Sequence, residues 1–131
     1  MPGAAILPGM SASVSTVVSD VNTARTVGSG SLDVFATPMM IALMELAACE
    51  CLADCLDAGQ ASVGTEVSVE HVAASPVGAV ITASATVESV DGRKIVFSVS
   101  AHDGVGEIGK GLHTRFLIDE EKFMSKANAR R

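Results

Sequence analysis

Along the second half of the chain, apolar and polar residues alternate. Between positions 61 and 118, Val, Ile, Thr and Ser recur with a period of two, which is typical of strands that bury one face. In the first such run, Val67, Val69 and His71 fall on one face and polar residues fall on the other. The alternation predicts strands over 65–72, 78–90, 94–101 and 107–118, and a further strand over 13–24.

Two Asp-Gly pairs separate the last three of these strands. Asp91-Gly92 and Asp103-Gly104 are strong turn signals, because glycine adopts the positive φ angle that tight hairpins require. The two pairs therefore predict a long antiparallel meander.

Between Thr37 and Gly59 the pattern changes to that of a helix. Thr37 suits an N-cap, Pro38 suits the first turn, and Gly59 suits the C-terminal stop. The first three turns are apolar on almost every side, which predicts that this half is buried. The second half carries a solvated acidic stripe at Glu50, Asp54 and Asp57. A short charged helix over 119–129 is predicted to end the chain.

The order of these elements predicts the fold. An antiparallel sheet needs a cover for its apolar face, and one long buried helix can supply it. We therefore predict an α+β fold of the hotdog type, in which an antiparallel sheet wraps around one central buried helix. The length suits one domain over residues 1–131, and the chain shows no internal repeat or linker.

The composition supports a folded protein and excludes several classes. Hydrophobic residues make up 48% of the chain and charged residues 18%, a balance that forms a core. The formal net charge of -6 argues against a nucleic-acid partner, because it repels phosphate backbones. The chain has no apolar run of about 18 residues and no Lys/Arg-rich secretory start, so we expect no membrane partner.

Three cysteines, Cys49, Cys51 and Cys55, lie close together on the predicted helix. An odd number so closely spaced does not form a disulfide framework, and no histidine pair accompanies them as metal ligands. They are interpreted as small core residues in a protein of the reducing cytoplasm.

Two residues stand out as candidates for chemistry. Glu45 lies in the apolar half of the helix, where poor solvation suits a catalytic carboxylate, although a salt bridge would also account for it. His71 lies on the apolar face of its strand, as a hydrogen-bonded core histidine or as the partner of Glu45. Thr37 offers a hydroxyl at the helix start, besides its capping role.

The segment 104–109 matches G-x-G-x-x-G letter for letter, but it follows a hairpin turn and leads into an alternating strand. A dinucleotide site would need a parallel strand before it and a helix after it. The Rossmann reading is therefore rejected. Arg115 lies on the strand that follows, where it can pair with a carboxylate or with a ligand's phosphate or carboxylate.

Taken together, these stretches resemble the fluoroacetyl-CoA thioesterase family of hotdog proteins over positions 33 to 123. The similarity is carried by Val34-Phe35-Ala36-Thr37, Leu43-Met44-Glu45, Gly64-Thr65, Val69-Glu70-His71, Ala73-Ala74-Ser75-Pro76, Ser100-Ala101-His102-Asp103-Gly104-Val105, Glu107-Ile108-Gly109, Gly111, His113, Arg115 and Glu121-Lys122-Phe123. It implies a cytoplasmic acyl-CoA thioesterase with a catalytic site made of Thr37, Glu45 and His71. It also implies substrate-binding residues at Gly64, Arg115 and Phe35.

The expected reaction is attack of water on the thioester of a small acyl-CoA, with Glu45 as general base or as nucleophile. No metal or other cofactor is expected, and coenzyme A is part of the substrate. A Gly/Ser-rich segment over 26–32 replaces the family's aromatic lid, which favours a different acyl group. An exposed sheet edge predicts a homodimer or a dimer of dimers. The alternatives are a hotdog hydratase-dehydratase and a non-catalytic acyl-CoA-binding dimer.

Overall fold

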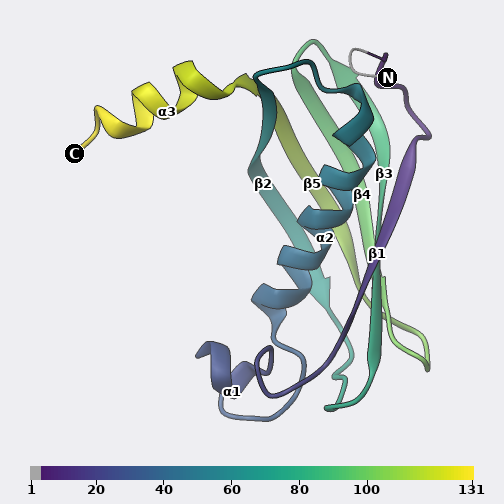
Figure 1. The fold of residues 1–131 in the computed structure, drawn as a ribbon. Helices are drawn as coiled ribbons and strands as arrows, with labels where there is room; N and C mark the ends of the chain where they lie inside the picture. Colours follow the sequence, from purple (N-terminus) through teal and green to yellow (C-terminus); the bar gives the residue numbers. More distant parts are fainter. Residues whose placement is uncertain (1–3) are drawn as a thin grey trace.

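The computed structural model describes residues 4–131, which form one curled sheet around one long helix (Figure 1). A 3-10 turn, Ala53–Cys55, continues the long helix α2. The elements in chain order are β1 Ser11–Val17, α1 Ala24–Val27, α2 Thr37–Leu52, β2 Gln60–His71, β3 Val80–Asp91, β4 Lys94–His102, β5 Glu107–Asp119 and α3 Glu120–Asn128.

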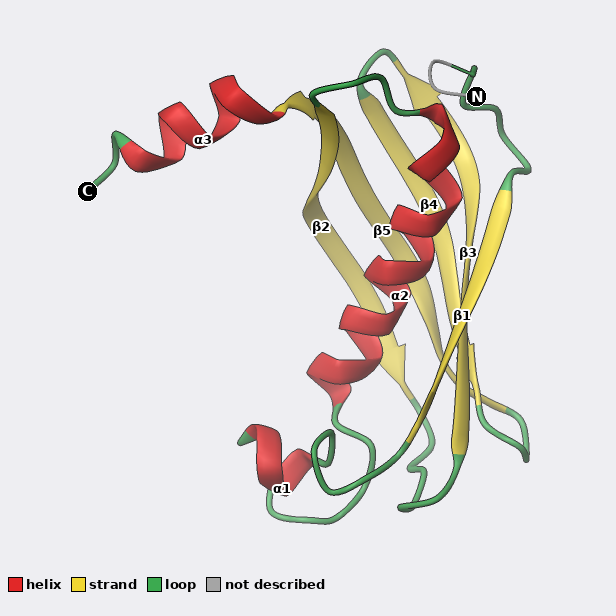
Figure 2. Cartoon of the chain, in the orientation of Figure 1, coloured by secondary structure: helices red, strands yellow, loops and turns green. Residues whose placement is uncertain are grey.

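The five strands form a single antiparallel sheet in the order β1-β3-β4-β5-β2. The three strands joined by the Asp-Gly turns form the predicted meander. β2 does not extend it, because it pairs with β5 rather than with its sequence neighbour β3. Both β1 and β2 therefore have a free edge, on opposite sides of the sheet (Figure 2).

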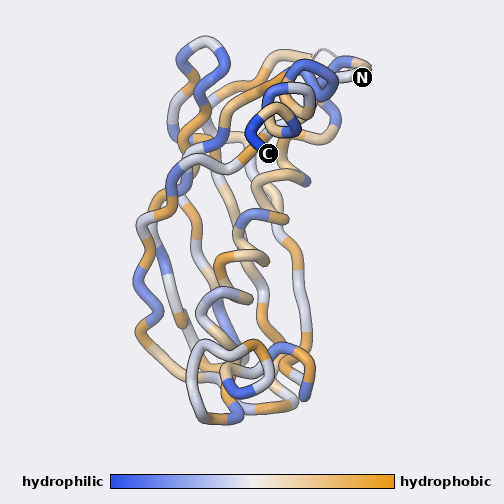
Figure 3. The backbone as a smooth tube through the Cα atoms, turned by 90° about the vertical axis from the view of Figure 1, so that its left-hand side faces the viewer, coloured by the Kyte–Doolittle hydropathy of each residue, from blue (hydrophilic) through white to orange (hydrophobic). Residues whose placement is uncertain are grey.

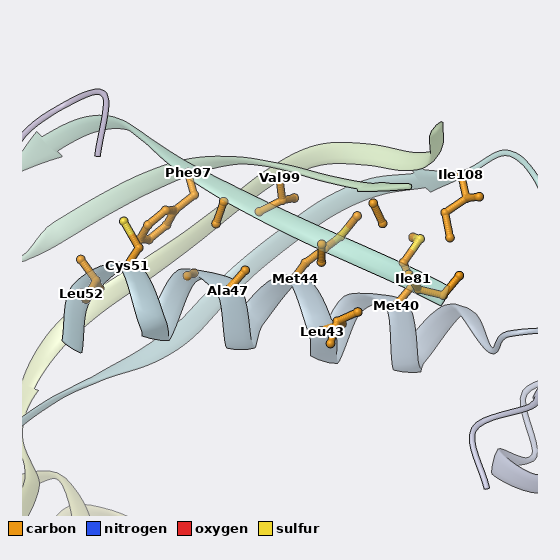
Figure 4. Close-up of a cluster of buried hydrophobic side chains, with 14 of the residues drawn as sticks. Met40, Leu43, Met44, Ala47, Cys51, Leu52, Ile81, Phe97, Val99 and Ile108 are labelled. Atoms are coloured by element: carbon orange, nitrogen blue, oxygen red, sulfur yellow. The ribbon is translucent and has the colours of Figure 1, made fainter. Parts of the chain in front are cut away.

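Helix α2 lies in the concave face of the sheet, as the sequence predicts (Figures 1 and 2). Met40, Met44 and Ala47 are fully buried on its sheet-facing side. Side chains of the sheet point toward them, among them those of Phe97 and Val99 (Figure 4). Burial of this apolar surface is the main force that holds helix and sheet together.

Several boundaries differ from the prediction, among them the start of β2, which begins at Gln60 rather than at 65. The N-terminal strand ends at Val17, and the residues that follow turn into α1 because Thr23 caps that helix and Gly28 ends it with a φ of 92°. Helix α2 ends at Leu52 instead of continuing to Gly59. Its N-cap is Ala36 and not Thr37, whose hydroxyl makes a different bond.

Strand β2 contains a β-bulge that the alternation did not reveal. Gly64 pairs with Arg115 and Glu66 pairs with Thr114, so Thr65 is the extra residue. The bulge shifts the alternation by one position. As a result, Gly64 faces the helix together with the predicted set Val67, Val69 and His71.

The glycine-rich segment after β4 has a packing role. An added Cβ at Gly109 would lie 2.6 Å from the sulfur of Met40 and 2.7 Å from the carbonyl oxygen of Glu70. At Gly104 and Gly106 it would meet no atom within 4 Å. Only the last of these three glycines is therefore required for close packing of the sheet on the helix.

We expect Gly109→Ala to destabilise the fold by about 1–3 kcal/mol, because the new methyl group overpacks a filled site. Urea unfolding followed by circular dichroism measures the effect, and Gly104→Ala is the matched control. Equal stabilities for the two variants would show that the close packing at Gly109 relaxes without cost.

Helix α3 projects away from the sheet beyond β2 and carries no buried residue (Figure 1). Its residues are largely hydrophilic, as Figure 3 shows beside the C-terminus. Among residues 4–131, no helix is long and apolar enough to cross a membrane. Cys51 and Cys55 are buried as predicted, Cys49 is half-buried, and all three are free thiols.

Candidate active site

The first part of the site lies at the start of α2. Thr37 is the first residue of this helix, and His71 is the last residue of β2. Their side chains meet, with 2.8 Å between Oγ1 of Thr37 and Nδ1 of His71. The residue predicted to cap the helix therefore orients an imidazole instead.

The second nitrogen of His71 has no protein partner. Nε2 is buried, and no hydrogen bond reaches it within the described part of the chain. Burial lowers the pKa of this histidine, because the charged imidazolium loses hydration, while a backbone hydrogen bond with Ala73 acts in the opposite direction. The ring is thus held neutral at pH 7, and Nε2 is the nitrogen free to meet a ligand.

A hollow of about 270 Å³ opens beside this pair. Phe35, which is 2% exposed, forms one wall together with Val34, and residues 72–74 form another. The hollow therefore brings the predicted substrate-binding Phe35 next to Thr37 and His71.

A buried hydrogen bond connects this wall to the β4–β5 hairpin. Ser75 is fully buried, accepts a bond from the amide of Phe35 through its carbonyl, and donates from its hydroxyl to Asp103 at 2.8 Å. The amides of Val105 and Gly106 also donate to Asp103. Led by the Val105 bond, these donors hold the pKa of the Asp103 carboxyl below its usual range. The hairpin thus fixes the position of Phe35.

The second part of the site is centred on Glu45, in the middle of α2. Its Oε2 accepts a hydrogen bond of 3.1 Å from Nη1 of Arg115 and lies 3.7 Å from Nε2 of His113. The Arg115 side chain is 7% exposed, whereas that of Glu45 is 40% exposed. The carboxylate is therefore more solvated than the sequence predicts, and it is held by a buried cation.

Arg115 uses most of its donors inside the protein. Nε and Nη2 donate to the hydroxyl and the carbonyl of Ser62, at 2.9 and 3.0 Å. Nη1 serves both Glu45 and His113. The pairing with a carboxylate is one of the two roles considered for this arginine, and here it fixes the orientation of Glu45.

Gly64 makes room for the carboxylate. An added Cβ would lie 2.5 Å from Oε2 of Glu45, 3.0 Å from the His113 ring and 3.3 Å from Nη1 of Arg115. Any side chain at this position would displace the carboxylate. The observed position of the carboxylate therefore depends on glycine at the predicted position 64, next to the proposed catalytic group.

The two parts are separate within one chain. Thr37 and Glu45 are eight residues apart on one helix, which corresponds to about 12 Å along its axis. Within residues 4–131, no hydrogen bond or ion pair connects Glu45 with Thr37 or His71. The expected contact between Glu45 and His71 is thus not formed inside a single protomer, because β2 extends His71 toward the helix start.

Comparison with known proteins identifies the family. A family model described as fluoroacetyl-CoA-specific thioesterase, FlK, matches residues 18–121. The chain belongs to this thioesterase family. It is 48% identical over 94 residues to the fluoroacetyl-CoA thioesterase of Streptantibioticus cattleyicolor, covering 72% of this chain and 68% of that protein. It is accordingly a thioester hydrolase.

Solved structures agree with this assignment. A phenylalanine-to-alanine variant of the fluoroacetyl-CoA-specific thioesterase, in complex with fluoroacetate and CoA, superposes with a TM-score of 0.86 at 40% identity, over 90% of this chain and 99% of that one. A hot-dog-like protein from Thermanaerovibrio acidaminovorans gives 0.85 at 27% identity, over 94% and 91%. The predicted hotdog fold and α+β class are confirmed.

The surroundings of Glu45 contain groups to which the sequence assigned no role. His113 and Ser62 are buried or half-buried partners of Arg115, and the carbonyl of Glu66 is a partner of His113. A possible signal was the placement of His113 and Arg115 two positions apart on one strand, which predicts a shared face. No group of three or more His, Cys, Asp or Glu side chains within residues 4–131 is arranged to hold a metal ion.

Proposed function

We propose that this thioesterase hydrolyses a small acyl-CoA with Thr37, Glu45 and His71 as its catalytic residues. The observation that carries the proposal is the free, buried Nε2 of His71, held beside a hollow by the hydroxyl of Thr37. An unpartnered buried nitrogen on a neutral ring suits proton transfer with a ligand.

In the proposed reaction, Glu45 delivers water to the thioester carbonyl or attacks it directly. The carbonyl oxygen gains negative charge, which amide donors such as that of Gly64 stabilise. The carbon–sulfur bond then breaks, and the neutral His71 ring relays a proton of the hydrolytic water to the CoA thiolate, so that the imidazole is again neutral at the end of the cycle. Where Glu45 attacks, water afterwards hydrolyses the acyl-glutamyl anhydride and regenerates the carboxylate.

A single-turnover reaction in H₂¹⁸O separates these two routes. Direct water attack places ¹⁸O in the first acid released. Nucleophilic attack followed by hydrolysis at the Glu45 carbonyl places an unlabelled enzyme oxygen in the product and ¹⁸O in Glu45.

We further propose that the site is completed in a homodimer. The middle of β2, residues 64–68, is exposed at a free sheet edge, and Leu46 beside Glu45 is 47% exposed. Antiparallel pairing of two β2 strands about an axis near Val67 reverses one strand, so the Gly64 end of one meets the His71 end of the other. Glu45 of one chain would then lie near the Thr37–His71 pair of the partner subunit.

Light scattering at micromolar concentration should therefore report about twice the chain mass of 13.3 kDa. Twice the mass of that dimer would indicate a dimer of dimers. An active monomer would overturn the proposal, because the two parts of the site are too far apart within one chain.

The proposed substrate is a short acyl-CoA. A variant of the related fluoroacetyl-CoA-specific thioesterase forms a complex with fluoroacetate and CoA. The hollow beside Thr37 and His71 is small, about 270 Å³. Its outer wall includes Ala24 and Ser29, and residues 25–33 are exposed, with no aromatic side chain among them. We propose that this open entrance admits acyl groups other than fluoroacetyl.

The test is a thiol-release assay over fluoroacetyl-, acetyl-, medium-chain and aryl-CoA thioesters. Free thiol from at least one of them supports the proposal. A change in enoyl absorbance without thiol release would indicate a hydratase-dehydratase, and binding without either change would indicate a binding module. The mechanism needs no added cofactor, and the three free thiols support a reducing cytoplasm as its location.

A further inference from the structure

The buried histidine of β5 makes hydrogen bonds that the proposed reaction does not use. His113 is 1% exposed, and its ring stacks on Phe97 with 6.3 Å between centroids and 26° between planes. Nδ1 lies 2.9 Å from the carbonyl oxygen of Glu66, and Nε2 lies 3.1 Å from Nη1 of Arg115. Both ring nitrogens therefore have a fixed partner.

These partners determine where the proton sits. A carbonyl oxygen only accepts hydrogen bonds, so Nδ1 carries the hydrogen. Arg115 only donates, so Nε2 must offer its lone pair. His113 is thus held as a neutral imidazole with its proton on Nδ1.

The β-bulge explains why this acceptor is present. The extra residue Thr65 interrupts the ladder between Gly64 and Glu66, and His113 donates to the carbonyl of Glu66 at that point. The carbonyl of Glu66 at the bulge, the ring of His113 and the guanidinium of Arg115 thus form one continuous chain of hydrogen bonds.

We infer that His113 is a positioning residue for the catalytic carboxylate, an inference that rests on the proposed role of Glu45. By accepting one N–H of Nη1, it aims the other toward Oε2 of Glu45. Ser62 holds the remaining edge of the guanidinium. Glu45, Arg115 and the Glu66 carbonyl are the charged or polar groups that face the ring, and His113 touches no reacting atom itself.

Three substitutions separate this role from simple packing. His113→Phe keeps a ring against Phe97 and removes both nitrogens. His113→Asn places an amide near Nδ1 and can serve only the Glu66 carbonyl. His113→Gln places its oxygen near Nε2 and can still accept from Arg115.

We expect the Phe and Asn variants to lose about tenfold or more in kcat with little change in KM, because each loses a hydrogen bond to a charged group. The Gln variant should recover most of kcat. In a Glu45→Gln background, His113→Phe should cause little further loss, because both act through one carboxylate. Nitrogen-15 NMR should show a protonated Nδ1 and an unprotonated Nε2.

Urea unfolding of each variant, with Ile81→Val as a destabilised control away from the cluster, measures the structural contribution. Losses of kcat that follow stability alone, or equal kcat in all three variants, would overturn the inference. So would a proton on Nε2. If Glu45→Gln is itself fully active, the proposed function fails instead, and the NMR result still decides the tautomer.

Discussion

Replacing Glu45 by Gln is expected to lower kcat by about 10²-fold or more, because the amide is neither a general base nor an effective nucleophile. The fold should remain, since the amide oxygen can still accept the hydrogen bond of Arg115. Steady-state thiol release with the best acyl-CoA measures the loss, and circular dichroism and light scattering check that the variant keeps the fold and the mass of the wild-type protein in solution.

Glu50→Gln is the matched control for this substitution. It makes the same chemical change on the same helix, at an exposed position within the acidic stripe. We expect it to keep near wild-type kcat. A folded, dimeric Glu45→Gln variant with equally high activity would show that the carboxylate is structural, and a binding function would then gain support.

His71→Ala is expected to lower kcat to a similar extent, about 10²-fold, through loss of the imidazole that relays the proton. If His71 and Glu45 act as a unit, the double variant should lose much less than the product of the two single losses. His102→Ala removes a half-exposed imidazole and serves as the control. Independent, multiplicative losses would contradict a shared site.

The pH profile gives a second test of His71. Burial disfavours the imidazolium, so the pKa of His71 lies below the usual histidine value of 6.5. The neutral form therefore persists into mildly acidic solution, and activity that depends on it should fall only as the pH drops below that value. This acidic limb should be absent from the residual activity of His71→Ala. An unchanged limb in that variant would assign it to another group.

The local patterns predicted most of the fold because each depends on neighbouring residues. Alternation located the four strands, and the Asp-Gly pairs located two turns. Glycine at position 92 has a φ of 62°, as a tight turn requires. The pairing of β2 with β5 depends instead on contacts between residues that are far apart in the sequence, so no short stretch of sequence predicts it.

The sequence proposed residues for the candidate site but not their arrangement. Resemblance singled out Thr37, Glu45 and His71, yet the contact of His71 with Thr37 rather than with Glu45 depends on where β2 ends beside the helix. His113 was among the residues that carry the resemblance, but the sequence assigned it no function. Its role became visible only through two partners, the Glu66 carbonyl and Arg115, which lie at distant or irregular positions.

The extra residue Thr65 shifts the inside–outside alternation of β2 by one position. Deleting Thr65 would join Gly64 directly to Glu66 in a regular strand, so Gly64 and the set from Val67 to His71 would still face the helix, but the bulge at the Glu66 carbonyl that His113 contacts would be lost. Outside the bulge, engineering of this strand must add or remove residues in pairs, because a shift of one residue exchanges the two faces. Alignments with related sequences that lack the bulge should likewise place a gap opposite position 65.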